Sequence, residues 1–107
     1  MSTEPETFAS IVDWQNQTFG PMTVNRGFER ACEEYCELIE EFGRPTEERD
    51  YRKMALEAAD VIIVLSGFMA ACGQWNAVDQ KMAINRQRKW KTNGDGTGYH
   101  YQHEGEL

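Results

Sequence analysis

The sequence lacks the features of secreted, disulfide-stabilised and membrane-spanning proteins. Its 107 residues contain only three cysteines, an odd number without a metal-binding motif, which is typical of reduced thiols in a cytoplasm. The longest uncharged apolar stretch, about Val61–Ala71, is shorter than the roughly 20 residues that a membrane crossing needs. Because the N-terminal residues are acidic and polar, we also expect no signal peptide. We therefore predict a cytoplasmic protein that does not enter a membrane.

Histidines and strand signals are also scarce. The two histidines, His100 and His103, both lie near the C-terminus. A ferritin-like di-iron site needs Glu-x-x-His pairs within helices, so this class of metal protein is disfavoured. No short alternating apolar run is bounded by hairpin turns, which makes a β-rich fold a poor expectation.

Acidic residues outnumber basic ones. The 18 Asp and Glu residues against 11 Lys and Arg residues give a formal net charge of −7. This balance disfavours a nucleic acid polymer or an anionic membrane as the main partner. The chain is 40% hydrophobic, enough for one modest core. A domain this small buries a limited share of its surface, so we expect further subunits.

Helical periodicity predicts an all-α, four-helix bundle-like protomer. The expected helices cover residues 3–19, about 25–42, from within 46–51 to 72, and 76–90. Thr3 with Glu6 three residues later is a capping pattern for the first of them. Cys32 and Cys36 share one helical face and are expected to be small core residues. Residues 93–98 are rich in glycine, so we predict a helical domain over 1–92 and a flexible tail over 93–107.

The third predicted helix carries two carboxylates in an apolar setting. Within Leu56–Cys72 the only charged residues are Glu57 and Asp60, which lie three apart and share a face. Carboxylates are rarely buried unless they are paired or bind a metal. Either these two lie at an exposed helix start, where the dipole favours acids, or they hold a cation.

The second predicted helix offers a matching pair. Glu34 and Glu37 also lie three apart, within a glutamate-rich stretch that by itself is typical of a solvated face. If the two helices are antiparallel, four carboxylates would face one another and would repel strongly without a cation between them. Oxygen ligands without histidine or cysteine favour Mg²⁺ or Mn²⁺ over zinc.

The fourth predicted helix has the opposite charge. Residues 80–92 contain five Lys and Arg residues and no acid, which leaves −12 for the rest of the chain. Lys81, Asn85 and Arg88 fall on one face. A basic face beside an acidic metal site suits a polyphosphate, since the metal bridges phosphate oxygens and the cations hold the others. The alternative is a solvated basic helix end.

Two segments carry a family resemblance. Glu33–Glu37 (EEYCE) and, after 19 intervening residues, Glu57–Asp60 (EAAD) resemble the EExxE…ExxD signature of the MazG-like all-α nucleoside triphosphate pyrophosphohydrolases. Trp14 and the segment 81–90 are similar to the often phage-encoded branch of dATP/dGTP diphosphohydrolases, which includes the MazZ-type enzymes. The resemblance covers about residues 13–90.

The resemblance implies a ligand set and an assembly. It makes Glu34, Glu37, Glu57 and Asp60 the metal ligands, with Glu33 as an auxiliary carboxylate. Residues 1–92 would be the catalytic domain, and the protomer would form a homodimer or a dimer of dimers, with the site near the subunit interface. A phage-encoded member would work in the host cytoplasm.

The implied reaction is cleavage between the α- and β-phosphates of a (d)NTP with Mg²⁺, for which Mn²⁺ can substitute. The products are a nucleoside monophosphate and pyrophosphate. The expected substrate is a purine nucleotide such as (d)GTP or dATP. Glu37 or Glu33 would take the proton of the attacking water. We expect substrate contacts from one set of residues: Trp14, Lys81, Asn85, Arg86 and Arg88.

Two alternatives stay open. A related all-α enzyme that acts on dUTP or on damaged nucleotides would share the metal site and differ in its base pocket. A non-enzymatic acidic helical binding module would spread its acids over the surface. Such a module gives no reason to place Glu57 and Asp60 on an apolar helix.

Overall fold

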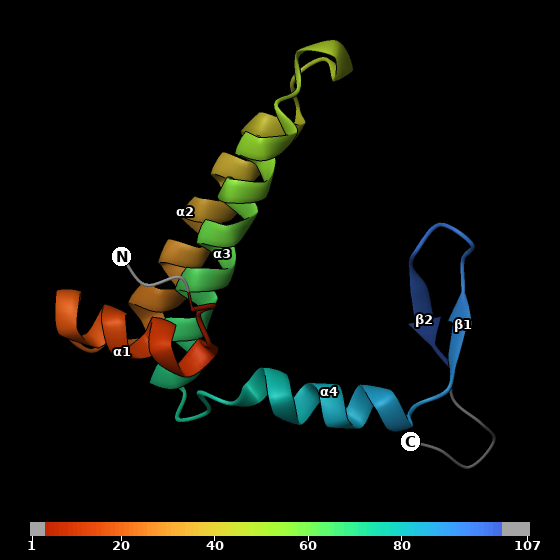
Figure 1. Cartoon of the computed structure of the whole chain (residues 1–107). Helices are drawn as coiled ribbons and strands as arrows, with labels where there is room; N and C mark the ends of the chain where they lie inside the picture. Colours follow the sequence, from red (N-terminus) through yellow and green to blue (C-terminus); the bar gives the residue numbers. More distant parts are fainter. Residues whose placement is uncertain (1–3, 102–107) are drawn as a thin grey trace. The chain divides into compact units, whose positions relative to one another are not determined.

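The computed structural model of the chain describes residues 4–101 (Figure 1). The described residues form two compact units, one that ends at Asn76 and one that begins at Ala77. Residues 4–101 contain four α-helices, as the sequence predicts, so the all-α fold class is confirmed.

The first unit is built on a helical hairpin. Helices α2 (Val24–Phe42) and α3 (Tyr51–Ala71) lie side by side and antiparallel, joined by a short loop that contains the 3₁₀ turn η1 (Thr46–Glu48) (Figure 1). Helix α1 (Phe8–Phe19) packs against α3. This arrangement places the two carboxylate pairs of the motif on neighbouring helices.

Local caps fix the ends of these helices. Thr7 and Ser10 cap each other reciprocally at the start of α1, with the Ser10 amide donating to Thr7 Oγ1 at 3.0 Å. The expected start near Thr3 was wrong over the described part of that segment, because residues 5–7 are not helical and this later capping pair starts the helix; Thr3 itself lies outside the described residues. At the start of α3, the Asp50 carboxylate accepts a hydrogen bond from the Lys53 amide at 3.1 Å.

Helix α2 turns its large apolar residues outward. Its buried positions are Gly27, Ala31, Glu34 and Glu41. Its exposed face carries an apolar stripe, spaced 7, 4 and 3 residues apart: Phe28, Tyr35, Ile39 and Phe42. Cys32 and Cys36 are exposed as well, so their expected place in the core was wrong. Small residues let α2 approach α3 closely, and the stripe is left uncovered within one chain.

Glu41 ties the two long helices together at the loop end. This buried carboxylate is 7% exposed and pairs with Lys53 Nζ on α3 at 3.0 Å and with Arg44 Nε at 3.1 Å. The bond from Lys53, and next the bond from Arg44, lowers the pKa of Glu41 from its ordinary value of 4.5. These ion pairs thus hold α2 and α3 together next to the loop that joins them.

We expect Glu41→Gln to destabilise the fold at neutral pH and progressively less in acid. A carboxylate with a depressed pKa in the folded state stabilises that state above its unfolded pKa, and the contribution disappears as pH falls through the folded value. Urea unfolding at about pH 7 should therefore separate the variant from wild type, and the difference should shrink steadily as the pH is lowered below the ordinary value of 4.5. The matched control is Glu40→Gln on the exposed side of the same helix. An equal deficit at every pH would contradict the ion-pair account.

The second unit contains α4 (Ala77–Gln87) and a hairpin of β1 (Trp90–Thr92) and β2 (Gly98–His100). The strands are antiparallel, with Trp90 opposite His100 and Thr92 opposite Gly98. The expected helix through Trp90 therefore ends early. The turn explains the difference, because Asn93 N donates to Thr97 O at 2.8 Å and Gly94 and Gly96 adopt positive φ angles.

Candidate metal centre

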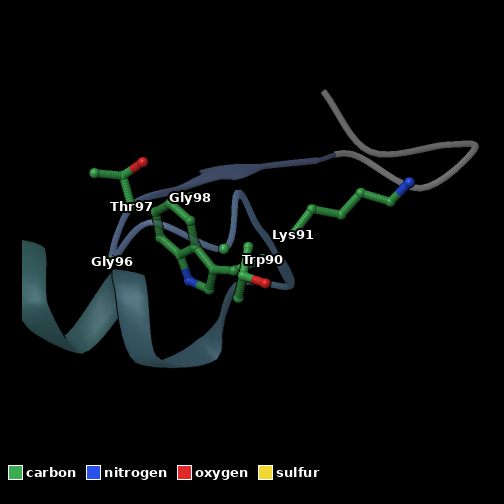
Figure 2. Close-up of a pocket in the computed structure, with 7 residues that line it drawn as sticks. Trp90, Lys91, Gly96, Thr97 and Gly98 are labelled. Carbon is green, nitrogen blue, oxygen red and sulfur yellow. The ribbon is translucent and has the colours of Figure 1, made fainter.

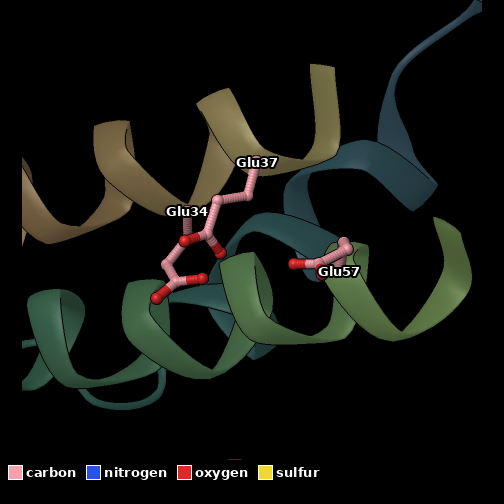
Figure 3. Close-up of side chains that lie close together, drawn as sticks. All are labelled: Glu34, Glu37 and Glu57. Atoms are coloured by element: carbon pink, nitrogen blue, oxygen red, sulfur yellow. The ribbon is translucent and has the colours of Figure 1, made fainter. Parts of the chain in front are cut away.

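Three glutamates of the first unit converge between α2 and α3. Glu34 and Glu37 reach from α2 toward α3, and Glu57 lies on α3 facing them (Figure 3). Each offers a carboxylate oxygen, and these oxygens all lie within 4.8 Å of one another. The spacing of three residues on α2 and the antiparallel packing produce this convergence.

The three carboxylates repel one another, and a cation bound between them would reduce this repulsion. A hydrogen bond with Glu34, and next the charge of Glu34, raises the pKa of Glu37 above its ordinary value of 4.5. Glu57 Oε2 is buried and has no hydrogen-bond partner within residues 4–101. A buried carboxylate oxygen without a partner is costly, and oxygen-only ligands suit Mg²⁺ or Mn²⁺. The residues present therefore fit a divalent cation.

The two remaining predicted carboxylates lie outside this trio. Asp60 is exposed, one turn beyond Glu57 on α3, and lines the same cavity as Glu34. Glu33 pairs with Arg26 Nη1 at 3.0 Å and with Arg30, and these bonds lower its pKa, that from Arg30 most. Glu33 thus forms ion pairs with two arginines. Asp60 lines the cavity wall.

A cavity of about 600 Å³ opens beside the cluster. One part of its wall is charged and includes Arg26, Arg30, Glu34 and Asp60. The remainder is largely apolar and includes Trp14, Phe19, Met22, Ile63 and Val64. Ligand sites in this size range combine an apolar wall with a few polar groups that fix orientation. The cavity can therefore take a molecule with one anionic and one flat apolar part.

Sequence reasoning missed Arg26 and Arg30 as site residues. Arg30 pairs with Glu34 of the cluster and with Glu33, and both arginines line the cavity. Arg26, Arg30 and Glu34 follow one another at intervals of four residues, and this spacing could have revealed the arginines, since residues four apart share a helix face. The densely basic fourth helix gives a stronger local signal for cationic substrate contacts than two arginines in an acidic helix.

Trp14 lies on the cavity wall, as its predicted substrate role requires. It is 54% exposed, and its ring contacts Phe19 edge to face with 5.6 Å between the centroids. An exposed aromatic pair at a cavity offers a flat surface for a base. Its stacking role stays a prediction.

The other predicted substrate residues belong to the second unit. Lys81, Asn85 and Arg86 lie on α4, and Arg88 follows it. Asn85 O accepts a hydrogen bond from Trp90 Nε1 at 2.7 Å, which joins α4 to the hairpin. Asn85 Oδ1 is buried without a hydrogen-bond partner in the described part of the chain. The roles of these four residues in substrate binding stay predictions.

The hairpin has a cavity of its own, of about 440 Å³. Trp90 reaches over the glycine-rich turn, while Lys91 points away from it (Figure 2). No carboxylate lines this cavity, whose remaining walls are Thr92, Gly94, Gly96, Thr97 and Gly98. It offers no ligand set for a hard cation, so the candidate metal centre is the glutamate cluster.

The chain shows similarity to known proteins among solved structures. No family model and no curated protein matches the chain. Among solved structures, the chain is similar to the MazG-like pyrophosphohydrolase of cyanophage S-2L, whose structure contains dGDP and three catalytic Mn²⁺ ions per active site. The two are 26% identical with a TM-score of 0.61, and the match covers 92% of this chain and 97% of the other.

The helical fold, the carboxylate cluster and this likeness define a class, the all-α hydrolases that act on phosphoric anhydrides. Within that class, the chain is similar in sequence and fold to a MazG-like pyrophosphohydrolase.

Proposed function

We propose that this protein is a Mg²⁺-dependent (d)NTP pyrophosphohydrolase that prefers purine nucleotides such as (d)GTP and dATP. It would cleave the α–β phosphate bond and release a nucleoside monophosphate and pyrophosphate. The observation that carries the proposal is the Glu34, Glu37 and Glu57 cluster at a cavity with arginines and aromatic rings on its walls. The dGDP and Mn²⁺ of the cyanophage enzyme support the same reading.

The carboxylates would divide the work. Glu34, Glu37 and Glu57, with Asp60 as a fourth ligand, would hold divalent cations that supply Lewis-acid chemistry to water and phosphate. Glu37 is the best candidate to accept the proton of the attacking water, because it is the exposed member of the cluster and water can reach its carboxylate. Glu33 would position the arginines through its two ion pairs.

Cationic side chains would hold the phosphates. Arg26 and Arg30 line the cavity beside the cluster, and a planar guanidinium binds phosphate oxygens in pairs. Trp14 would stack on the base, while Lys81, Asn85, Arg86 and Arg88 would add phosphate or ribose contacts. The phosphate chain then extends along the charged wall and the base along the apolar wall.

We expect Arg30→Gln to lower kcat/KM for a (d)NTP by about 10- to 100-fold, because a charge-assisted contact to phosphate is lost. Steady-state kinetics at saturating Mg²⁺ would measure the change, with Arg30→Lys losing less because it keeps the charge. The matched control is Arg44→Gln, which removes an ion pair to Glu41 outside the cluster. Equal kinetics for Arg30→Gln and Arg44→Gln would remove Arg30 from the site.

The proposed activity is tested with a panel of nucleotides. Each (d)NTP, together with dUTP and oxidised nucleotides, would be incubated with Mg²⁺, with Mn²⁺ or with EDTA, and monophosphate and pyrophosphate quantified. We expect purine turnover with either metal and none with EDTA. Faster turnover of dUTP or a damaged nucleotide would transfer the substrate assignment to that class. No turnover, with binding of basic proteins instead, would favour the acidic binding module.

We propose that the protein works as a homodimer or homotetramer in the cytoplasm. Few side chains of the described residues are fully buried, whereas the apolar stripe of α2 and several large residues of α3 are exposed. Contiguous exposed apolar surface of this kind marks an interface. By length and composition alone α3 could also cross a membrane, but its Glu57 faces the glutamates of α2. We therefore expect a second copy of the chain, and not a membrane, to cover this surface.

A further inference from the structure

Gln15 holds a buried oxygen that the fold leaves without a partner. The residue lies on α1, is 7% exposed and lines the cavity beside the metal cluster. Its Oε1 atom is buried and accepts no hydrogen bond from residues 4–101. Buried polar atoms in native proteins almost always have a partner, so this oxygen calls for an explanation.

The orientation of the Gln15 amide is fixed by its other end. Nε2 donates to the carbonyl oxygen of Ile63 on α3 at 2.8 Å. The reverse orientation would set two acceptor oxygens against each other, so the amide cannot flip without losing this bond. The atom left over is therefore an acceptor, and it needs a donor.

Gly67 and Met22 pack closely around this oxygen. A Cβ atom on Gly67 would lie 2.8 Å from Gln15 Oε1 and 2.8 Å from Met22 Cε, so only glycine fits at this point. The cover over the oxygen thus includes the end of a methionine, an unbranched and adaptable side chain that can shift and admit a ligand group from the cavity. Any larger residue at position 67 would clash with both side chains.

We propose that Gln15 Oε1 reads the nucleobase by accepting a hydrogen bond from an exocyclic amino group. Adenine, guanine and cytosine carry such a group, which donates without an acceptor on the same atom. Uracil and thymine instead offer a ring N–H between two carbonyl oxygens, and both oxygens would approach the Gln15 oxygen. The substrate class is therefore nucleotides with amino-bearing bases. This inference rests on the proposed function and names the chemistry by which the same cavity selects its base.

The test compares nucleotides that differ only in the amino group. Dissociation constants would be measured by calorimetry with non-hydrolysable α,β-imido analogues, pairing dATP with its 6-unsubstituted purine analogue and dGTP with dITP. We expect wild type to bind at least one amino-bearing member about tenfold more tightly, the worth of one hydrogen bond to a buried acceptor. Gln15→Met should abolish that preference, because methionine is similar in length to glutamine but has no amide. Gln17→Leu on the exposed side of α1 should retain it.

The outcomes separate this inference from the proposed function. Nucleotide binding by wild type without any preference for the amino group would overturn the role of Gln15 and leave the proposed function standing. Retention of the preference in a folded Gln15→Met variant would overturn it as well. Absence of binding to every nucleotide would instead refute the proposed function. The wild-type comparison decides the question even if Gln15→Met fails to fold.

Discussion

Glu57→Gln is expected to reduce nucleotide hydrolysis by about a thousandfold, because it removes a ligand of the cations whose Lewis-acid chemistry is worth several kcal/mol. Glu57 is the α3 member of the cluster, and its buried Oε2 has no hydrogen-bond partner in the described residues. The substitution removes a charged metal ligand but keeps the size of the side chain. Helicity should be preserved, so circular dichroism and turnover measured together would separate catalysis from folding.

The same variant has a signature that does not depend on activity. Without metal, Glu57→Gln should melt at the same temperature as wild type or higher, because it relieves repulsion among three close carboxylates. Added Mn²⁺ should raise the melting temperature of wild type and have much less effect on the variant, since a ligand stabilises only the state that binds it. The control is Glu40→Gln, outside the cluster on α2. A variant that keeps both turnover and the Mn²⁺ response would contradict the site.

Ile39→Glu is expected to break the proposed oligomer into monomers. Ile39 is 51% exposed in the middle of the α2 stripe, between Tyr35 and Phe42. A charge placed in an apolar interface must be desolvated without a partner, which costs far more than the contact it replaces. Light scattering after size exclusion, at concentrations where wild type is an oligomer, would measure the change.

The Ile39→Glu result also bears on the architecture of the site. The stripe and the cluster occupy different faces of α2, so monomers that retain Mn²⁺ binding would show that one chain holds the metal alone. The matched control is Glu40→Lys, an exposed charge change next to the stripe, which should leave the oligomer intact. An unchanged mass for Ile39→Glu would contradict the assignment of this stripe to the interface.

The sequence predicted the helices well because their signals are local. Gly43 and Gly73 end the two long helices, and the apolar periodicity of α2 and α3 is strong. The two failures have a local cause as well. Thr7 with Ser10 forms the reciprocal cap that starts α1, and the asparagine, aspartate and glycine turn converts residues 90–100 into a hairpin.

The candidate site was predictable only where helical spacing dictates it. Motif spacing and antiparallel packing are enough to bring Glu34, Glu37 and Glu57 together. The spacing could not reveal that Asp60 stays outside the trio, since this depends on how α3 is rotated about its axis. It also could not reveal Gln15, whose role depends on the approach of α1 to Ile63 and Gly67, 48 or more residues along the chain.

The cysteines and the apolar stripe illustrate the same limit. Cys32 and Cys36 lie four residues apart on α2, and this spacing predicts that they share a face without showing what that face contacts. Within one chain the space against α3 is taken by Gly27, Ala31 and the buried glutamates. The predicted core position of the cysteines was therefore wrong within one chain, and we propose that a second copy covers the stripe.

The position of bond cleavage tests the central claim most directly. Wild-type protein would hydrolyse dGTP with Mg²⁺ in ¹⁸O-labelled water, and mass spectrometry would locate the label in the products. We predict labelled dGMP and unlabelled pyrophosphate, as attack of water on the α-phosphorus requires. Label in pyrophosphate, release of orthophosphate alone, or no turnover of any nucleotide would contradict the account.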